Sequence, residues 1–149
     1  MKVRCIANTG TDIPESYFLP HLGYKKEMEF NLVVGKEYVV YALYEWQGKV
    51  WYYICDERYT YYPIHNPAPL FEVVDNRLSK YWTVEIAANG LLTLAFEQWF
   101  AEPDFYEKLT AQKEKEVLIF DKVKYLMDIE AASIKTDDKF VQQAAAQIS

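Results

Sequence analysis

The sequence predicts an α+β protein in which a strand-rich first half packs against a second half of strands and helices. Three observations lead to this class. Short β segments alternate with turn residues over residues 1–76, bulky residues follow one another on both sides of a Gly-centred turn, and charged residues recur without a breaker over residues 114–132. With 149 residues, 51% of them hydrophobic, the chain is near the usual size of one domain.

The first half is expected to contain several short strands separated by turns and one long loop. Asn8 to Thr11 has turn chemistry, and prolines and a glycine interrupt the loop. We predict that prolines also keep the stretch from His65 to Pro69 irregular, because each proline restricts the residue before it. The predicted segments are a strand at Lys2–Ala7, a loop over 12–31, strands at about 36–46 and 49–55, a tight turn at 56–58, a strand at Tyr59–Tyr62 and a short β segment at Leu70–Val74.

Gln47 and Gly48 are expected to form the two-residue turn of a β-hairpin, since glycine adopts positive φ without strain. This turn predicts four facing pairs: Trp46 with Lys49, Tyr44 with Trp51, Ala42 with Tyr53, and Val40 with Cys55. Apolar residues occupy both faces, unlike the alternation of a half-buried hairpin. Either the rest of the chain covers both faces, which we favour, or one face presents aromatic rings to a partner.

The second half is expected to combine a strand pair with helices, with residues 77–149 packed on residues 1–76 as an elaboration or as part of one continuous domain. Glu114–Ala132 is assigned as a helix, although EVLIF alone would suit a strand. The predicted segments are a strand at Tyr81–Ala87, a turn at Asn89-Gly90, a strand passing into a helical turn at Leu91–Phe100, a short helix at Asp104–Ala111, and a short helix or frayed end from Thr136.

The order of short strands in residues 1–76 resembles an SH3-like barrel of the bacterial and phage type. The resemblance is carried by VGKEY at Val34–Tyr38, WYYI at Trp51–Ile54, and YYP at Tyr61–Pro63 leading to LFEVVD. ALYEW at Ala42–Trp46 looks like the ALYDY signature of eukaryotic SH3 domains. It follows the long loop instead of preceding it, so polyproline binding is not expected.

No residue pattern in the chain indicates catalysis, a cofactor or a metal. Cys5, Cys55, His21 and His65 are scattered, whereas zinc motifs use close pairs. Both cysteines lie in expected strands among apolar residues, where a thiol is neither activated nor accessible. The five glycines are isolated and form no phosphate-binding loop. We therefore predict a protein that is not an enzyme.

The net charge of −6 argues against nucleic acid as the partner, because the electrostatic attraction of Lys and Arg to phosphates is missing. No apolar run follows the N-terminal charges, and no stretch approaches the length of a membrane span. We expect a cytoplasmic protein that does not interact with membranes. An acidic surface suits a basic protein partner.

The predicted function is non-enzymatic binding of a protein partner. In general character the chain is similar to bacterial immunity proteins, which implies a basic toxin domain as the partner. The alternatives are a phage or mobile-element accessory protein that inhibits a host factor, an enzyme with an unrecognised site, and a cage for a cationic ligand formed by Trp46 with Tyr59, Tyr61 and Tyr62. The expected binding residues are Trp46, Asp56, Glu57, Tyr59 and Tyr61.

Overall fold

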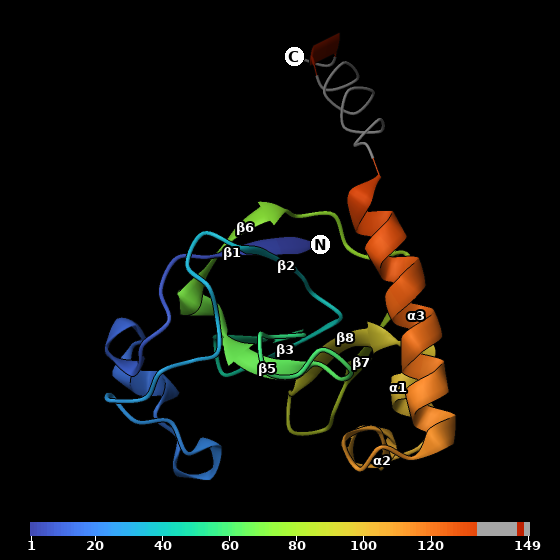
Figure 1. Ribbon diagram of the computed structural model, residues 1–149, viewed down its shortest axis with the longest axis horizontal. Helices are drawn as coiled ribbons and strands as arrows, with labels where there is room; N and C mark the ends of the chain where they lie inside the picture. Colours follow the sequence, from blue (N-terminus) through green and yellow to red (C-terminus); the bar gives the residue numbers. More distant parts are fainter. Residues whose placement is uncertain (134–145, 148–149) are drawn as a thin grey trace.

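The α+β class is confirmed by the computed structural model, which describes residues 1–133 and 146–147 (Figure 1). The described residues form two antiparallel sheets and three α-helices. The predicted C-terminal segment from Thr136 begins outside the described residues.

The smaller sheet pairs strands from the beginning and the end of residues 1–76. Its strand order is β2-β1-β6, with β1 (Lys2–Cys5) in the centre between β2 (Glu37–Val39) and β6 (Phe71–Asp75). One face of β1 carries Val3 and Cys5, which are almost completely buried. This alternation of buried and partly exposed residues is typical of a strand with one covered face.

The larger sheet contains strands from both halves of the chain, in the order β5-β4-β3-β8-β7. The division into residues 1–76 and 77–149 stays a prediction, and hydrogen bonds between β3 and β8 cross it. The strands are β3 (Ala42–Trp46), β4 (Lys49–Ile54), β5 (Ile64–Pro67), β7 (Trp82–Ile86) and β8 (Leu92–Phe96).

The prediction of one continuous strand over 36–46 is wrong, because the chain bends at Val40 and Tyr41 and enters the second sheet. The Val40 amide donates to the Met1 carbonyl at 3.1 Å, while the Tyr41 amide donates to the Tyr53 carbonyl at 2.9 Å. Both side chains at the bend are buried. The ladder between β3 and β4 therefore ends at the pair Ala42–Tyr53 and does not reach the predicted pair Val40–Cys55.

The stretch from Asp56 to Pro69 also differs from the prediction. No strand forms over Tyr59–Tyr62, because the Asp56 carboxylate accepts hydrogen bonds from the amides of Arg58 and Tyr59, each at 2.8 Å, and turns the chain. A strand does form over Ile64–Pro67, where irregular structure was expected. β5 is an edge strand, so Pro67 can lack an N–H without breaking a ladder.

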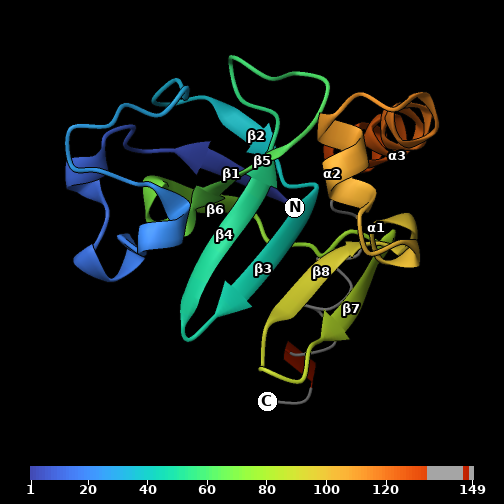
Figure 2. The same ribbon diagram turned by 90° about the horizontal axis from the view of Figure 1, so that it is seen from below.

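The helices follow β8 directly and pack at one end of the larger sheet (Figure 2). They are α1 (Glu97–Ala101), α2 (Phe105–Thr110) and α3 (Glu114–Ala132). The predictions of helix over Glu114–Ala132 and of a strand passing into a helical turn near residue 97 are confirmed. The described residues also contain four short 3-10 turns: Gly10–Asp12, Glu15–Tyr17, Pro20–Leu22 and Ala68–Leu70.

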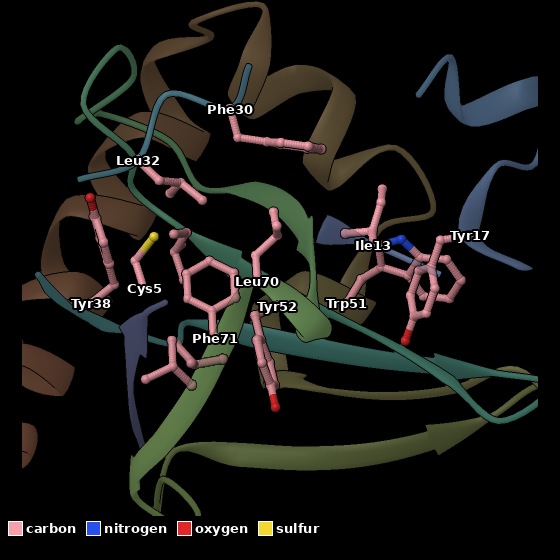
Figure 3. Packing of buried hydrophobic residues seen from close by; sticks show 13 residues of the cluster. Cys5, Ile13, Tyr17, Phe30, Leu32, Tyr38, Trp51, Tyr52, Leu70 and Phe71 are labelled. Atoms are coloured by element: carbon pink, nitrogen blue, oxygen red, sulfur yellow. The ribbon is translucent and has the colours of Figure 1, made fainter. Parts of the chain in front are cut away.

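Two hydrophobic clusters hold these layers together. The first contains residues of both sheets and of the N-terminal loop, and Figure 3 shows Tyr52, Leu70 and Phe71 packed within it. The second lies beneath the helices and centres on Phe96, Leu109 and Phe120. Tyr41 links α3 to the sheets, because its hydroxyl donates to Asp128 at 2.5 Å and its carbonyl accepts from the Trp82 indole at 2.8 Å. The two sheets do not close into a barrel, so the SH3-like barrel stays a prediction.

Candidate binding site

The hairpin register places a row of aromatic side chains on one face of the larger sheet. The predicted pairs Trp46–Lys49, Tyr44–Trp51 and Ala42–Tyr53 are confirmed. Because directly opposed residues share a face, Tyr44 also shares its face with Thr93 of β8, and Tyr53 shares its face with His65 of β5. The opposite face carries Tyr52, which packs against Phe71 of the smaller sheet with ring centroids 5.8 Å apart.

Two adjoining pockets lie on this outer face, and together we call them the aromatic groove. They have volumes of about 220 and 290 Å³ and share Tyr44 and Leu91. One pocket is bounded by the 3-10 turn at Pro20–Leu22, and the other reaches Trp99 of α1. In Figure 2 the sheet lies between the turn-rich N-terminal segment and helices α1 and α2. The groove is lined by Leu19, His21, Leu22, Tyr44, Trp46, Trp51, Tyr53, His65, Asn89, Leu91, Thr93 and Trp99.

Ring contacts fix the floor of the groove before any ligand binds. Tyr44 stacks on Trp51 with centroids 4.7 Å apart, and Tyr53 meets the edge of Trp99 at 5.0 Å. The Tyr106 ring stacks on Trp99 at 5.2 Å, and its hydroxyl donates to the Pro63 carbonyl at 2.7 Å. Rings held in this way lose little conformational freedom on binding, which favours affinity.

The N-terminal loop covers the other part of the aromatic row. Tyr17 packs edge-on against Trp51 at 5.2 Å, and its hydroxyl accepts a hydrogen bond from the Val50 amide at 3.0 Å. Trp51 is only 1% exposed as a result. The favoured alternative, coverage within the chain, holds for Trp51, whereas Tyr44 and Trp46 are only partly buried. Presentation of these rings to a partner stays a prediction.

The ionisable side chains at the floor of the groove are held in their neutral forms. Burial lowers the pKa of His65, and the nearby His21 lowers it further, so His65 is uncharged. Burial raises the pKa of Tyr53 to about 12, so its hydroxyl keeps its proton. No carboxylate, lysine or arginine is among the described residues that line the groove. Such a surface suits apolar side chains and the flat faces of cations.

The five residues predicted to bind a partner do not form one surface. Trp46 lies at the turn end of the hairpin and lines the groove. The other four follow the opposite end of β4, which spans six residues and is therefore about 20 Å long. Asp56 is 6% exposed and holds the turn after β4, so its role here is structural.

Glu57 and the tyrosines after it, some exposed and some partly buried, form a separate cluster. Glu57 pairs with Lys36 and accepts a hydrogen bond from the Tyr38 hydroxyl at 2.9 Å, and both contacts lower the pKa of its carboxyl. Tyr62 lies 5.0 Å from Tyr59 and 4.9 Å from Tyr61, measured between ring centroids. Arg58 already lies over the Tyr59 ring at 5.1 Å, and Trp46 is remote, so the four-residue cation cage is not assembled.

Of the twelve residues that line the groove, the sequence predicted only Trp46 as a site residue. Tyr44 and Tyr53 could have been found, because the hairpin register already placed them on the face of Trp46. His65 and Trp99 could not, because they reach the groove through β5 and α1, whose placement depends on contacts between distant segments.

The cysteines and acidic groups do not form a second chemical site in the described part of the chain. Burial raises the pKa of Cys5, and it raises that of Cys55 to about 12, so both thiols are protonated and unreactive. Both are free thiols. Residues 1–133 and 146–147 contain no cluster of three or more Cys, His, Asp or Glu side chains that could hold a metal ion. Nor does any helix within them combine the length and hydrophobicity needed to cross a membrane.

No protein-family model matches this chain, and neither a curated protein nor a solved structure is similar to it.

Proposed function

We propose that this protein is a non-enzymatic binding module and that it recognises a protein partner through the aromatic groove. The observation that carries the proposal is the row of partly buried rings that runs from Trp46 through Tyr44 and Tyr53 on one sheet face to Trp99 of α1. Tryptophan and tyrosine are the residues that most often dominate the binding energy of protein interfaces.

The dimensions of the groove favour a protein partner over a small-molecule substrate. The groove is divided into two pockets of about 220 and 290 Å³, each at or below the lower end of the roughly 300–1,000 Å³ of ordinary ligand pockets. The two pockets adjoin, so they offer successive positions for side chains of a loop or an extended segment. The described residues that line the groove include no cysteine, serine, lysine or carboxylate that could act as a nucleophile.

The charge of the chain favours a basic partner. A net charge of −6 attracts a basic protein over long distances, and exposed aromatic rings bind Arg or Lys by cation–π contact. We therefore propose a cytoplasmic protein of the bacterial immunity type, which occludes a basic toxin domain. An accessory protein that inhibits a host factor would use the same groove, and the identity of the bound partner separates the two.

We also propose that residues 1–76 derive from an SH3-like barrel. Two features support this. The chain bends at Val40 and Tyr41, so β2 and β3 serve different sheets, as strands do at the corners of orthogonally packed sheets. The long N-terminal loop follows β1, and a 3-10 turn at Ala68–Leu70 precedes the last strand of this half. An experimental structure in which the strand directions of the two sheets run parallel would contradict this derivation.

Capture of partners from the source cell tests the function. The tagged full chain, Trp46→Ala and Tyr125→Ala are used as baits at equal amounts, and the bound proteins are identified by mass spectrometry. Tyr125 is the matched control, because it is an aromatic residue 67% exposed on α3 and does not line the groove. Circular dichroism checks that each bait is folded.

The proposal predicts one stoichiometric basic protein that binds the wild type and Tyr125→Ala equally. Removal of an aromatic hot-spot residue typically costs about 2–4 kcal/mol, so Trp46→Ala should bind it roughly 30-fold or more weakly. Equal capture by Trp46→Ala, or loss of capture only with Tyr125→Ala, would show that the groove is not the binding surface.

A further inference from the structure

One of the two pockets of the aromatic groove is lined by rings from four different elements, and we call it the ring pocket. The rings belong to Tyr44 of β3, Tyr53 of β4, His65 of β5 and Trp99 of α1, and Leu91 and Thr93 complete the lining. The volume of the ring pocket is about 290 Å³, which is the share of roughly ten water molecules at about 30 Å³ each.

The rings meet at steep angles and so form walls of different orientation. The Tyr53 centroid lies 5.8 Å from that of Tyr44 and 5.0 Å from that of Trp99, with the ring planes inclined by 53° and 72°. His65 lies 5.7 Å from Tyr53, and these two planes are inclined by 63°. A small group that enters the ring pocket therefore contacts several rings at once, as in the aromatic cages that bind cations.

Two of the walls are backed by rings that do not line the ring pocket. Tyr44 is stacked on Trp51, and Trp99 is stacked on Tyr106. The cage is thus assembled before a ligand binds, so that little of the binding energy is lost in ordering side chains.

The polarity of the ring pocket selects the kind of cation. No carboxylate is among the described residues that line it, and the lowered pKa of His65, caused mainly by burial, keeps that ring uncharged near pH 7. The ammonium of lysine and the guanidinium of arginine carry several N–H donors, and removing these donors from water without replacing their hydrogen bonds is costly. A quaternary ammonium has no N–H donor, so it can exchange water for ring faces without losing a hydrogen bond.

A carboxylate just outside the ring pocket favours a positive charge within it. Burial, and to a smaller extent the Glu107 carboxylate, raise the pKa of Tyr53 to about 12. Because the effect of Glu107 on Tyr53 is electrostatic, the same carboxylate attracts a cation that lies beside Tyr53. Glu107 does not line the ring pocket, so it adds attraction at a distance and no direct hydrogen-bond acceptor.

We propose that the ring pocket binds a quaternary ammonium group, with Tyr44, Tyr53 and Trp99 in contact with its methyl groups. This inference rests on the proposed role of the aromatic groove, and it names the chemistry that one of the two pockets takes. The group can come from a trimethylated lysine of a protein partner or from a small molecule of the choline type.

An NMR titration of the full chain with three probes tests this chemistry. Choline carries the quaternary ammonium, dimethylbutanol is its uncharged analogue with carbon in place of nitrogen, and ethanolamine is its analogue without the methyl groups. We expect choline to shift the signals of the Trp99 indole and the Thr93 amide saturably, and to bind about 5- to 30-fold more tightly than dimethylbutanol. Ethanolamine should bind more weakly than choline, because its N–H donors lose hydrogen bonds to water.

Substitutions at Thr93 and Trp99 locate the site. Thr93→Val keeps the shape of the side chain and should bind choline like the wild type, because a quaternary ammonium donates no hydrogen bond to the hydroxyl. Thr93→Lys places a competing ammonium beside the rings and should abolish binding, and Trp99→Leu removes one ring and should weaken it. Trp46→Ala changes only the adjoining pocket and is the control, which should bind choline normally. Circular dichroism checks that each variant is folded.

Equal binding of choline and dimethylbutanol would overturn the proposal, because the ring pocket would then be apolar without preference for a cation. The absence of saturable shifts up to about 10 mM choline, or choline binding that Thr93→Lys leaves intact, would also overturn it. A peptide that carries trimethyllysine separates the two sources. Tighter binding of the peptide than of choline would identify a methylated protein partner, and tighter binding of choline would identify a small molecule.

Choline binding is measured without a partner, so failure of this inference is distinguishable from failure of the proposed function. Partner capture that depends on Trp46, together with no choline binding, would reject the cage and leave the proposed function standing. Choline binding together with partner capture that is unaffected in Trp46→Ala would reject the proposed function and leave the cage standing.

Discussion

At the scale of single residues, the groove depends on rings that the chain itself holds in place. Tyr44 and Tyr53 were on the correct face in the predicted register, so the floor of the groove could be read from the sequence. His65 could not be placed there, since its prolines suggested irregular structure and its strand exists only as the edge of a sheet built from distant segments.

His65 should make the protein less stable in acid. Its pKa is lowered in the folded state, first by burial and then by His21, whereas the unfolded chain binds the proton near pH 6.5. Stability from the neutral ring is present above that pH and is lost as the pH falls toward the folded-state pKa. We expect the free energy of unfolding of the wild type to decrease more between about pH 7.5 and 5.5 than that of His65→Gln.

Urea unfolding at both pH values measures how much the free energy of unfolding of each protein changes with pH. A loss of stability that the substitution causes equally at both pH values does not affect this comparison. His21→Gln is the control, and it should retain most of the wild-type slope because burial is the larger cause of the shift. Parallel pH profiles for the wild type and His65→Gln would mean that His65 is not held neutral by the fold.

At the scale of the elements, local sequence patterns predicted strands and helices correctly where the whole segment belongs to a single sheet or a single helix. The hairpin turn, the passage of β8 into α1 and the helix over Glu114–Ala132 were of this kind. The patterns failed at the bend at Val40 and Tyr41, where an apolar run continues while the chain changes sheets. An apolar run has the same sequence pattern whether its residues are buried in one sheet or are divided between two.

Gly10 should determine the position of the N-terminal loop, whose turn at Pro20–Leu22 bounds the groove. A β-carbon at this position would overlap the Lys25 carbonyl oxygen, and the Gly10 amide already donates to Met28 at 2.8 Å. Overpacking against backbone typically costs about 1–3 kcal/mol. We therefore expect Gly10→Ala to destabilise the protein by this amount and to displace the turn at Pro20–Leu22, measured by denaturant unfolding and by binding of the captured partner.

Gly23→Ala is the matched control in the same loop. Gly23 has φ +71 with open space around it, so alanine there costs only the left-handed conformation, about 1 kcal/mol. If Gly23→Ala proves more damaging than Gly10→Ala, close approach of the backbone at Gly10 is not what holds the loop.

At the scale of the whole molecule, the sheet that carries the groove is shared by both halves of the chain. β3, β4 and β5 come from the first half, and β8 with α1 from the second, so neither half alone contains the complete groove. The sequence placed Trp46 in the same predicted site as Tyr59 and Tyr61, because residue type and proximity along the chain were the available signals. The length of β4 separates them, and only the assembled sheet reveals this.

The central claim is that the aromatic groove binds the partner, and hydrogen exchange of the full chain with and without the captured partner tests it most directly. The backbone of the groove rims, at Pro20–Leu22 and in the turn before Leu91, is outside the ladders, so we expect it to exchange faster than the strands in the free protein. We predict that the partner slows exchange at both rims. Slowing confined to the cluster at residues 57–62, with both rims unchanged, would contradict the account.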